Sequence, residues 1–358
     1  MKKIYSFIAL IAAAGVFGQA GAPASPYYNG FNFNQTGTAL KTALANKIQA
    51  THTKELSYSN VWEALKIADR DPANANNVLL IYGWENGSDG NATNDHSRSK
   101  DDNGGSNGQW NREHTFAQAL GNPDLGQSGP GADAHHLRAC DVQRNGTRGN
   151  LKFAAGSGTP SGASGSGWYP GDEWKGDVAR MMMYMYLHYD TQCLPTTIGI
   201  GTTAPTDSNM LNLFLQWNAE DPVSQYEDNR NTYLGNASNT YGQGNRNPFI
   251  DNPYLATLIW GGTPAQNRWP TLALPQVSDA FSLISVYPNP SNDHRINIDS
   301  EVELDEIELI TINGQVMQRI QRPVFQNNTY TIENLPQGFY LLRLVSNQQA
   351  TVKKVLVN

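Results

Sequence analysis

The apolar positions between residues 36 and 68 recur at helical spacing. Leu40, Leu44 and Ile48 are four residues apart, as are Val61 and Leu65, and Ile67 follows as a further apolar position. Residues three or four positions apart lie on one face of a helix, so the pattern predicts two amphipathic helices packed on a core. Ser57 or Ser59 is expected to cap the second helix, because a serine hydroxyl can accept a free backbone N–H of the first turn.

Beyond these helices the pattern becomes strand-like. The continuous apolar run 78–82 predicts a buried strand, and short strands are expected at 109–114 and 135–139. Asp141 is a suitable N-cap for a helix that carries Asn145. A strand, a loop, a second strand and a helix are thus expected around one point. Farther along, residues 178–189 predict a dense apolar helix whose methionines belong to the core.

Residues 86–107 are rich in Gly, Asn, Asp and Ser and predict a long loop. Its carboxylates at Asp89, Asp95, Asp101 and Asp102 could bind Ca²⁺. Their spacing does not match an EF-hand, so a solvated loop is the favoured interpretation.

The pattern of apolar and polar residues changes after residue 275. Short apolar or alternating runs at 296–298, 307–310, 330–332, 340–344 and 352–357 are separated by turn signals such as Asn313-Gly314. They predict a small β-sandwich. Its only histidine is His294, so catalysis is not expected there.

The first residues have the pattern of a secretory signal. Lys2 and Lys3 precede an apolar run at 4–17 and small residues around 18–20, so residues 1–19 are expected to be removed. No later segment approaches the ~20 apolar residues of a membrane span, so no stable membrane insertion is expected.

Charge and cysteine content narrow the possible functions. The net charge of -7 disfavours broad electrostatic binding of nucleic acid. Basic residues nevertheless gather near the strand–helix region: Arg112, Arg138, Arg144, Arg148 and Lys152. They either meet phosphate or form ordinary ion pairs. Cys140 and Cys193 are the only cysteines, and they form either one disulfide or two buried thiols.

Glu113, His114 and Asn145 are the main candidates for chemistry. Carboxylate and carboxamide oxygens suit Mg²⁺, and imidazole can accept a proton from water near neutral pH. Neighbouring strand residues point to opposite faces, so Glu113 and His114 would act from different sides unless the strand is bulged. The alternative is a surface glutamate beside a core histidine.

A second cluster follows in the sequence. Asp133, His135 and His136 either bind metal directly or, as we favour, support and pack around the first group. Asn150 has the alternative role of a helix-terminal cap. No Gly-x-Ser-x-Gly elbow precedes an apolar helix in the expected strand context, and no Walker-type loop is present, which disfavours a serine hydrolase and a nucleotide hydrolase.

Several ordered motifs carry a family resemblance. They are 112–114 (Arg-Glu-His), 133–137 (Asp-Ala-His-His-Leu), 145–150 (Asn-Gly-Thr-Arg-Gly-Asn), 175–180 and 244–251. Together they resemble the endonuclease I family of secreted bacterial nucleases with a ββα-metal site, over roughly residues 27–260. The resemblance implies an α+β fold with a mainly helical nuclease domain at 20–274. A linker at 275–285 and an all-β sandwich at 286–358 would follow.

The resemblance also implies residue roles. His114 would be the general base, and Glu113 and Asn145 would hold Mg²⁺, with Mn²⁺ or Ca²⁺ as substitutes. Either Arg148 or Arg112 would steady the cleaved phosphate. We therefore expect a monomeric, Mg²⁺-dependent endonuclease that cuts DNA with little sequence preference and leaves 5′-phosphate ends, and RNA cleavage stays an open alternative. The alternatives are a ribonuclease of the same fold and a secreted binding or adhesive protein on a degenerate nuclease fold.

The C-terminal region resembles the sorting domain of type IX secretion. Residues 286–290 (Val-Tyr-Pro-Asn-Pro), 335–340 and 352–357 carry the match. It implies recognition by an outer-membrane export machine, and a secreted or cell-surface location reached through the periplasm. An ordinary carbohydrate-binding or adhesive module is the alternative.

Overall fold

The computed structural model describes residues 22–87, 89–269, 281, 284–346 and 349–358. The chain divides into two compact units, Met1–Thr271 and Leu272–Asn358. The signal segment expected at 1–19 lies outside the described residues, as does most of the linker expected at 275–285. Those domain bounds therefore stay predictions. In the part of the chain that is described, no helix has the length and apolar character needed to cross a membrane.

The first unit mixes helices and short strands. Its helices are α1 (Gly37–Thr51), α2 (Tyr58–Ala68), α3 (Val142–Arg148), α4 (Lys175–Tyr189), α5 (Pro195–Ile198), α6 (Asn212–Glu220), α7 (Gln225–Leu234), α8 (Pro248–Asp251) and α9 (Tyr254–Trp260). Its strands are β1 (Arg70–Asp71), β2 (Asn74–Leu79), β3 (Ser97–Ser99), β4 (Trp110–His114), β5 (Leu137–Asp141), β6 (Gly162–Ser164), β7 (Gly167–Tyr169), β8 (Thr203–Ala204) and β9 (Asp207–Leu211). This mixed content agrees with an α+β class.

The two N-terminal helices form as predicted. α1 buries Leu40, Leu44 and Ile48 on one face. The Ser57 hydroxyl, and not that of Ser59, caps α2 by accepting a hydrogen bond from the backbone N–H of Asn60. The apolar stripes of both helices therefore face the core.

Two predicted strands are shifted in the structure. The run 78–82 was expected to be one strand, but β2 ends at Leu79 and Tyr82 has a φ of 72°. This left-handed conformation is costly for a bulky residue and turns the chain out of the strand. The second strand begins at Leu137 instead of 135, because the backbone N–H of His135 donates to the Asp133 side chain in a local turn (2.8 Å).

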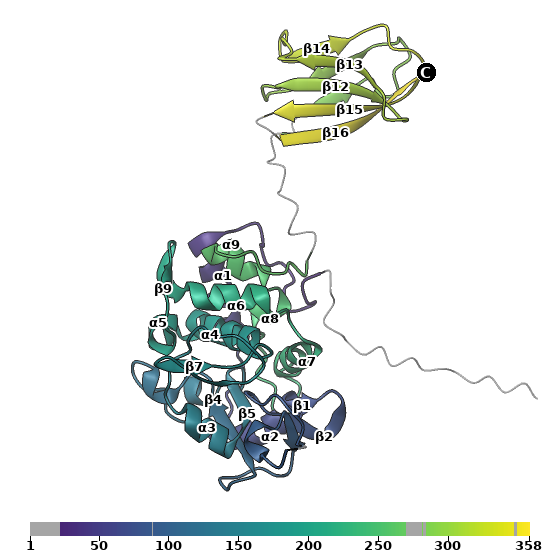
Figure 1. Ribbon diagram of the computed structural model, residues 1–358. Helices are drawn as coiled ribbons and strands as arrows, with labels where there is room; N and C mark the ends of the chain where they lie inside the picture. The colour runs from purple at the N-terminus through teal and green to yellow at the C-terminus, as the bar shows by residue number, and fades with distance from the viewer. Residues whose placement is uncertain (1–21, 88, 270–280, 282–283, 347–348) are drawn as a thin grey trace, which may run out of the picture. The chain divides into compact units, whose positions relative to one another are not determined.

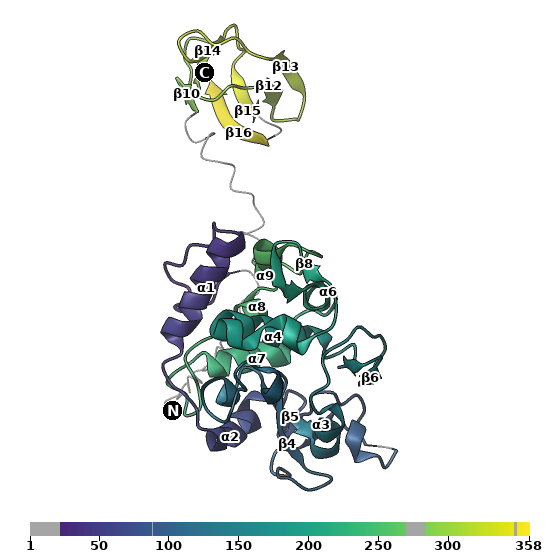
Figure 2. The same cartoon turned by 90° about the vertical axis from the view of Figure 1, so that its left-hand side faces the viewer.

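β4, β5 and α3 form a ββα unit. β4 and β5 pair antiparallel, with Glu113 opposite Arg138 and His114 opposite Leu137. The Asp141 carboxylate at the end of β5 accepts hydrogen bonds from the first free N–H groups of α3, as its N-cap role predicts. Figures 1 and 2 show the ββα unit at one end of the first compact unit, with α9 at the other end and the buried α4 between them.

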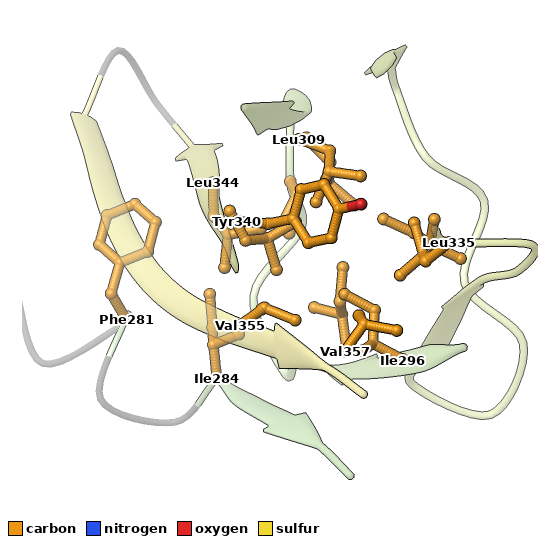
Figure 3. Close-up of a cluster of buried hydrophobic side chains, with 14 residues drawn as sticks. Phe281, Ile284, Ile296, Leu309, Leu335, Tyr340, Leu344, Val355 and Val357 are labelled. Carbon is orange, nitrogen blue, oxygen red and sulfur yellow. The ribbon is translucent and has the colours of Figure 1, made fainter. Parts of the chain in front are cut away.

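The second unit is the predicted β-sandwich. Its strands are β10 (Ser285–Tyr287), β11 (Ile296–Asp299), β12 (Glu306–Thr311), β13 (Val316–Gln321), β14 (Thr329–Ile332), β15 (Gly338–Ser346) and β16 (Gln349–Val357). One sheet has the order β10-β11-β14 and the other β13-β12-β15-β16. Side chains from both sheets, among them Ile296, Leu309 and Val355, form a common core (Figure 3). Alternation of buried and partly exposed residues along β15 places this core between the sheets.

Candidate active site

A cavity of about 390 Å³ opens beside the ββα unit. It is lined by residues of β4, of the loop after it and of α3: Arg112, Glu113, His114, Ala117, Gln118, Ala119, Asn145, Gly146, Arg148, Gly149 and Asn150. The structure therefore brings the main sequence candidates together in one cavity. Adjacent residues Glu113 and His114 both line it, although they come from opposite sides of a strand.

Glu113 is a buried carboxylate with one oxygen held by the protein. Tyr82 Oη and Arg148 Nη1 each donate to Oε1 at 3.0 Å. Both hydrogen bonds from described residues reach that same oxygen, which leaves Oε2 available to another ligand. Burial raises the pKa of Glu113 to about 7, against the opposing effects of Arg148 and Tyr82. A cation at Oε2 would compensate for the desolvation of the charged form.

Asn145 presents its carbonyl oxygen from α3. Its Nδ2 donates to Asn111 Oδ1 at 2.8 Å, which fixes the orientation of the carboxamide. Oδ1 is thereby left as an acceptor at the cavity wall. Asn111 was not among the sequence candidates. Its position in the sequence could have identified it, because Asn111 lies two residues before Glu113 and alternate residues of a strand share one face.

His114 has the protonation state of a base. Its Nε2 lies 2.9 Å from the carbonyl oxygen of Gly131, which can only accept, so Nε2 carries the proton and Nδ1 keeps its lone pair. Burial, with a contribution from His136, lowers the pKa of His114 to about 3. The ring stacks on Tyr58 at a centroid distance of 5.5 Å and an angle of 30°. The imidazole is therefore neutral near pH 7 and held between neighbours.

The two candidate arginines have different surroundings. Arg148 is 1% exposed and donates to Glu113, to the His114 carbonyl and to the Thr115 carbonyl. Such contacts suit a residue that holds the end of β4 in place. Arg112 is half-buried and stacks on Tyr58, 3.5 Å from the ring centroid. Its Nη1 also donates to the Tyr58 backbone carbonyl, but among the described residues Arg112 has no ion pair with a carboxylate, which leaves its charge available to a phosphate.

The second histidine cluster lies behind the cavity. The His136 ring contacts that of His114 at 5.6 Å, and its Nε2 donates to the Pro130 carbonyl. His135 instead bonds the Asn245 carbonyl at 2.9 Å. Neither histidine lines the cavity, whereas Asn150 does. The structure therefore places the His136 ring beside that of His114, and the His135 ring against the Asn245 carbonyl.

Asp133 belongs to a separate polar group. His52, Asp133 and His188 have ligand atoms that all lie within 4.8 Å of one another, which is close enough for a metal. Both oxygens of Asp133 already accept hydrogen bonds, and His52 Nδ1 lies 2.7 Å from His188 Nε2. The donors to Asp133 are Tyr184, Tyr189, Gln243 and the backbone of His135. The Asp133 carboxylate is thus satisfied by hydrogen bonds, unlike the free oxygens of Glu113 and Asn145, whereas His188 Nδ1 is buried without a partner among the described residues.

The disulfide alternative for Cys140 and Cys193 does not hold in the structure. Both thiols are free and buried. Cys140 lies on β5, with its Sγ 3.4 Å from the Ile81 carbonyl. Burial raises the pKa of both thiols, so each is an unreactive core residue.

Tyr82 and Tyr58 also escaped the sequence analysis. The strand predicted at 78–82 includes Tyr82, but its left-handed turn places the hydroxyl against Glu113. Tyr58, at the start of α2, contacts both His114 and Arg112. Neither role has a local sequence signal, since each contact joins segments more than 30 residues apart.

Comparison with known proteins identifies both units. The description "Endonuclease I" matches residues 36–254, and "Secretion system C-terminal sorting domain" matches residues 285–358. An extracellular ribonuclease of Bacillus amyloliquefaciens is 45% identical over 235 residues, which cover 63% of this chain and 75% of the relative. An extracellular ribonuclease of Bacillus subtilis is 43% identical over 256 residues, 67% of this chain and 82% of that protein.

A solved structure gives only a faint likeness. It is PorZ, a surface component of the type IX secretion system of Porphyromonas gingivalis, and it covers 24% of this chain and 12% of its own at 11% identity and a TM-score of 0.19. That likeness carries no argument. The family matches and the two relatives are sufficient to assign the chain. It belongs to the Endonuclease I family and is an extracellular nuclease with a C-terminal secretion sorting domain.

Proposed function

We propose that this chain is a Mg²⁺-dependent endonuclease that hydrolyses phosphodiester bonds of RNA and of DNA with little sequence preference. The observation that carries the proposal is the shared cavity of Glu113, Asn145 and His114, in which two oxygens and one imidazole nitrogen are left available. Nucleases of this family are generally metal-dependent. The proposed catalytic unit is mainly helical around its ββα motif.

The donor set fits a hard divalent cation. Glu113 Oε2 and Asn145 Oδ1 would hold Mg²⁺, with Mn²⁺ or Ca²⁺ as substitutes, because these ions prefer oxygen ligands. When bound, the ion supplies positive charge that stabilises the charge developing on the phosphate. Tyr82 and Arg148 hold the Glu113 carboxylate in position before the ion arrives.

The remaining residues act on water and phosphate. His114 accepts the proton of the attacking water at Nδ1, while its Nε2–H bond to Gly131 fixes the ring. Arg112 binds a phosphate oxygen through its guanidinium group, and stacking on Tyr58 limits its motion. Attack on phosphorus then releases a 3′ oxygen and leaves a 5′-phosphate.

The relatives favour RNA as one substrate, since both are named extracellular ribonucleases. We expect DNA to be cut too, because phosphate and metal contacts do not read the sugar. We expect the type IX secretion machinery to recognise the C-terminal sorting unit and export the enzyme.

The test is His114→Ala in the full chain. Structured RNA and plasmid DNA would be incubated side by side with Mg²⁺ or EDTA. We expect near-complete loss of cleavage with an unchanged circular dichroism spectrum. His294→Ala in the sandwich is the matched control and should retain activity. Wild-type cleavage by His114→Ala would contradict the proposal, and cleavage of RNA alone would restrict the substrate.

A further inference from the structure

Four oxygen-bearing side chains converge in the loop between β2 and β3, away from the active-site cavity. They are Glu85, Asp89, Asn94 and Asp95. The backbones of Glu85 and Asp95 form a parallel bridge, which brings the ends of the loop together. Asn94 Nδ2 donates to Asp89 Oδ2 at 3.1 Å, which ties the exposed carboxylate to this group. The four side chains therefore share one small region.

Three oxygens of this group are buried without a hydrogen-bond donor among the described residues. They are Glu85 Oε1, Asn94 Oδ1 and Asp95 Oδ1. Asn94 is only 5% exposed as a whole residue. A buried acceptor left without a partner costs about 1–3 kcal/mol, and more when it is charged. A common positive partner would satisfy all three acceptors.

The charges of this group also favour a bound cation. Glu85, Asp89 and Asp95 contribute three carboxylates, and Arg98 pairs with Asp95 at 3.0 Å. That same guanidinium also pairs with Asp141 at 2.8 Å, so its charge is divided. Desolvation, and then repulsion by Asp89, raises the pKa of Glu85. The group has more negative charge than its protein partners neutralise.

We propose that Glu85, Asp89, Asn94 and Asp95 form a Ca²⁺-binding site separate from the catalytic metal site. Ca²⁺ takes six to eight oxygen ligands in flexible geometry, and loop carbonyls and waters would complete its shell. Mg²⁺ suits the loop less well, because it demands near-ideal octahedral geometry and gives up water reluctantly.

The site would stabilise the loop against the ββα unit. Arg98 joins Asp95 of the loop to Asp141, the N-cap of α3. Arg144 of α3 donates to the Thr93 carbonyl of the loop at 3.0 Å. A cation that fixes the loop therefore also fixes the helix that carries Asn145. Its role is structural and does not depend on the proposed catalytic mechanism.

The test measures Ca²⁺ binding in a chain whose catalytic ligand is removed. The full chain with Glu113→Gln would be freed of metal by EDTA and titrated with Ca²⁺ by calorimetry in 1 mM Mg²⁺. Tb³⁺ luminescence sensitised by nearby tryptophan provides a second readout. We expect one bound Ca²⁺ per chain, and a rise in melting temperature with Ca²⁺.

Two variants and a control locate the site. Adding Glu85→Gln or Asp89→Asn should weaken Ca²⁺ binding at least tenfold. Asp102→Asn, a carboxylate change farther along the same chain segment, should leave it unchanged. If Glu85→Gln fails to fold, the exposed Asp89→Asn decides the question. No bound Ca²⁺ in the parent chain, or equal binding by Asp89→Asn and the parent, would overturn the proposal.

Discussion

Removal of the Tyr82 hydroxyl should weaken Mg²⁺ binding by more than its effect on folding stability explains. In Tyr82→Phe the ring stays in its buried position, but Glu113 Oε1 loses the donor at 3.0 Å. Arg148 still donates to that oxygen. The carboxylate is therefore retained but is less firmly oriented toward the site of the ion.

The size of the effect follows from the contact. A hydrogen bond to a charged group contributes about 1.5–3 kcal/mol, and we expect the remaining arginine to offset part of its loss. Mg²⁺ binding should weaken roughly tenfold, which corresponds to about 1.4 kcal/mol. The folded state should also lose about 1 kcal/mol, or roughly 2–4 °C of melting temperature for a domain of this size.

Tyr184→Phe is the matched control. It removes another fully buried tyrosine hydroxyl, which donates to Asp133 at 2.7 Å and accepts from Asn245 Nδ2 at 2.6 Å, and does not contact Glu113. We expect a similar loss of melting temperature but an unchanged Kd for Mg²⁺ in calorimetry. A wild-type Kd in Tyr82→Phe, or an equal loss of affinity in both variants, would refute the role given to Tyr82.

Three further outcomes are expected. Arg112→Ala should reduce kcat/KM for oligonucleotide cleavage about 10- to 100-fold, and Arg112→Lys should restore little of it, because lysine lacks the planar fork; a wild-type rate in Arg112→Ala would assign phosphate binding elsewhere. Alkylation of the unfolded, unreduced chain should label both Cys140 and Cys193 in a mass spectrum, and a pair of unlabelled sulfurs would show a disulfide. Burial lowers the pKa of His135 and of His136 to about 4 from 6.5, so the unfolded state binds more protons between those values. Stability should then fall as pH drops from 7 to 5, by about 2 kcal/mol for each histidine, and a urea midpoint that does not change over this range would contradict it.

Local patterns predicted much of the fold. The apolar spacing of Leu40, Leu44 and Ile48 placed α1, and Asp141 placed the start of α3. These features depend on neighbours along the chain, which a sequence displays directly. The alternating pattern of the C-terminal strands predicted the sandwich for the same reason.

Contacts between distant segments could not be predicted in this way. The left-handed turn at Tyr82 is stabilised by tertiary packing, so its residue type suggested only a strand. Arg148 was a reasonable phosphate ligand by sequence, but its burial beneath Glu113 became visible only in three dimensions. The family resemblance grouped Glu113, His114 and Asn145. The structure then showed which atom of each side chain is left without a hydrogen-bond partner in the part of the chain that it describes.

The central claim is that Glu113 and Asn145 hold the catalytic ion. It is tested most directly by Mg²⁺ calorimetry of Glu113→Gln and of Asn145→Ala, each combined with Glu85→Gln so that the loop does not contribute. Both variants should keep the parent's circular dichroism spectrum, lose measurable Mg²⁺ binding and lose RNA cleavage. Mg²⁺ affinity equal to that of the Glu85→Gln parent in either variant would contradict the account.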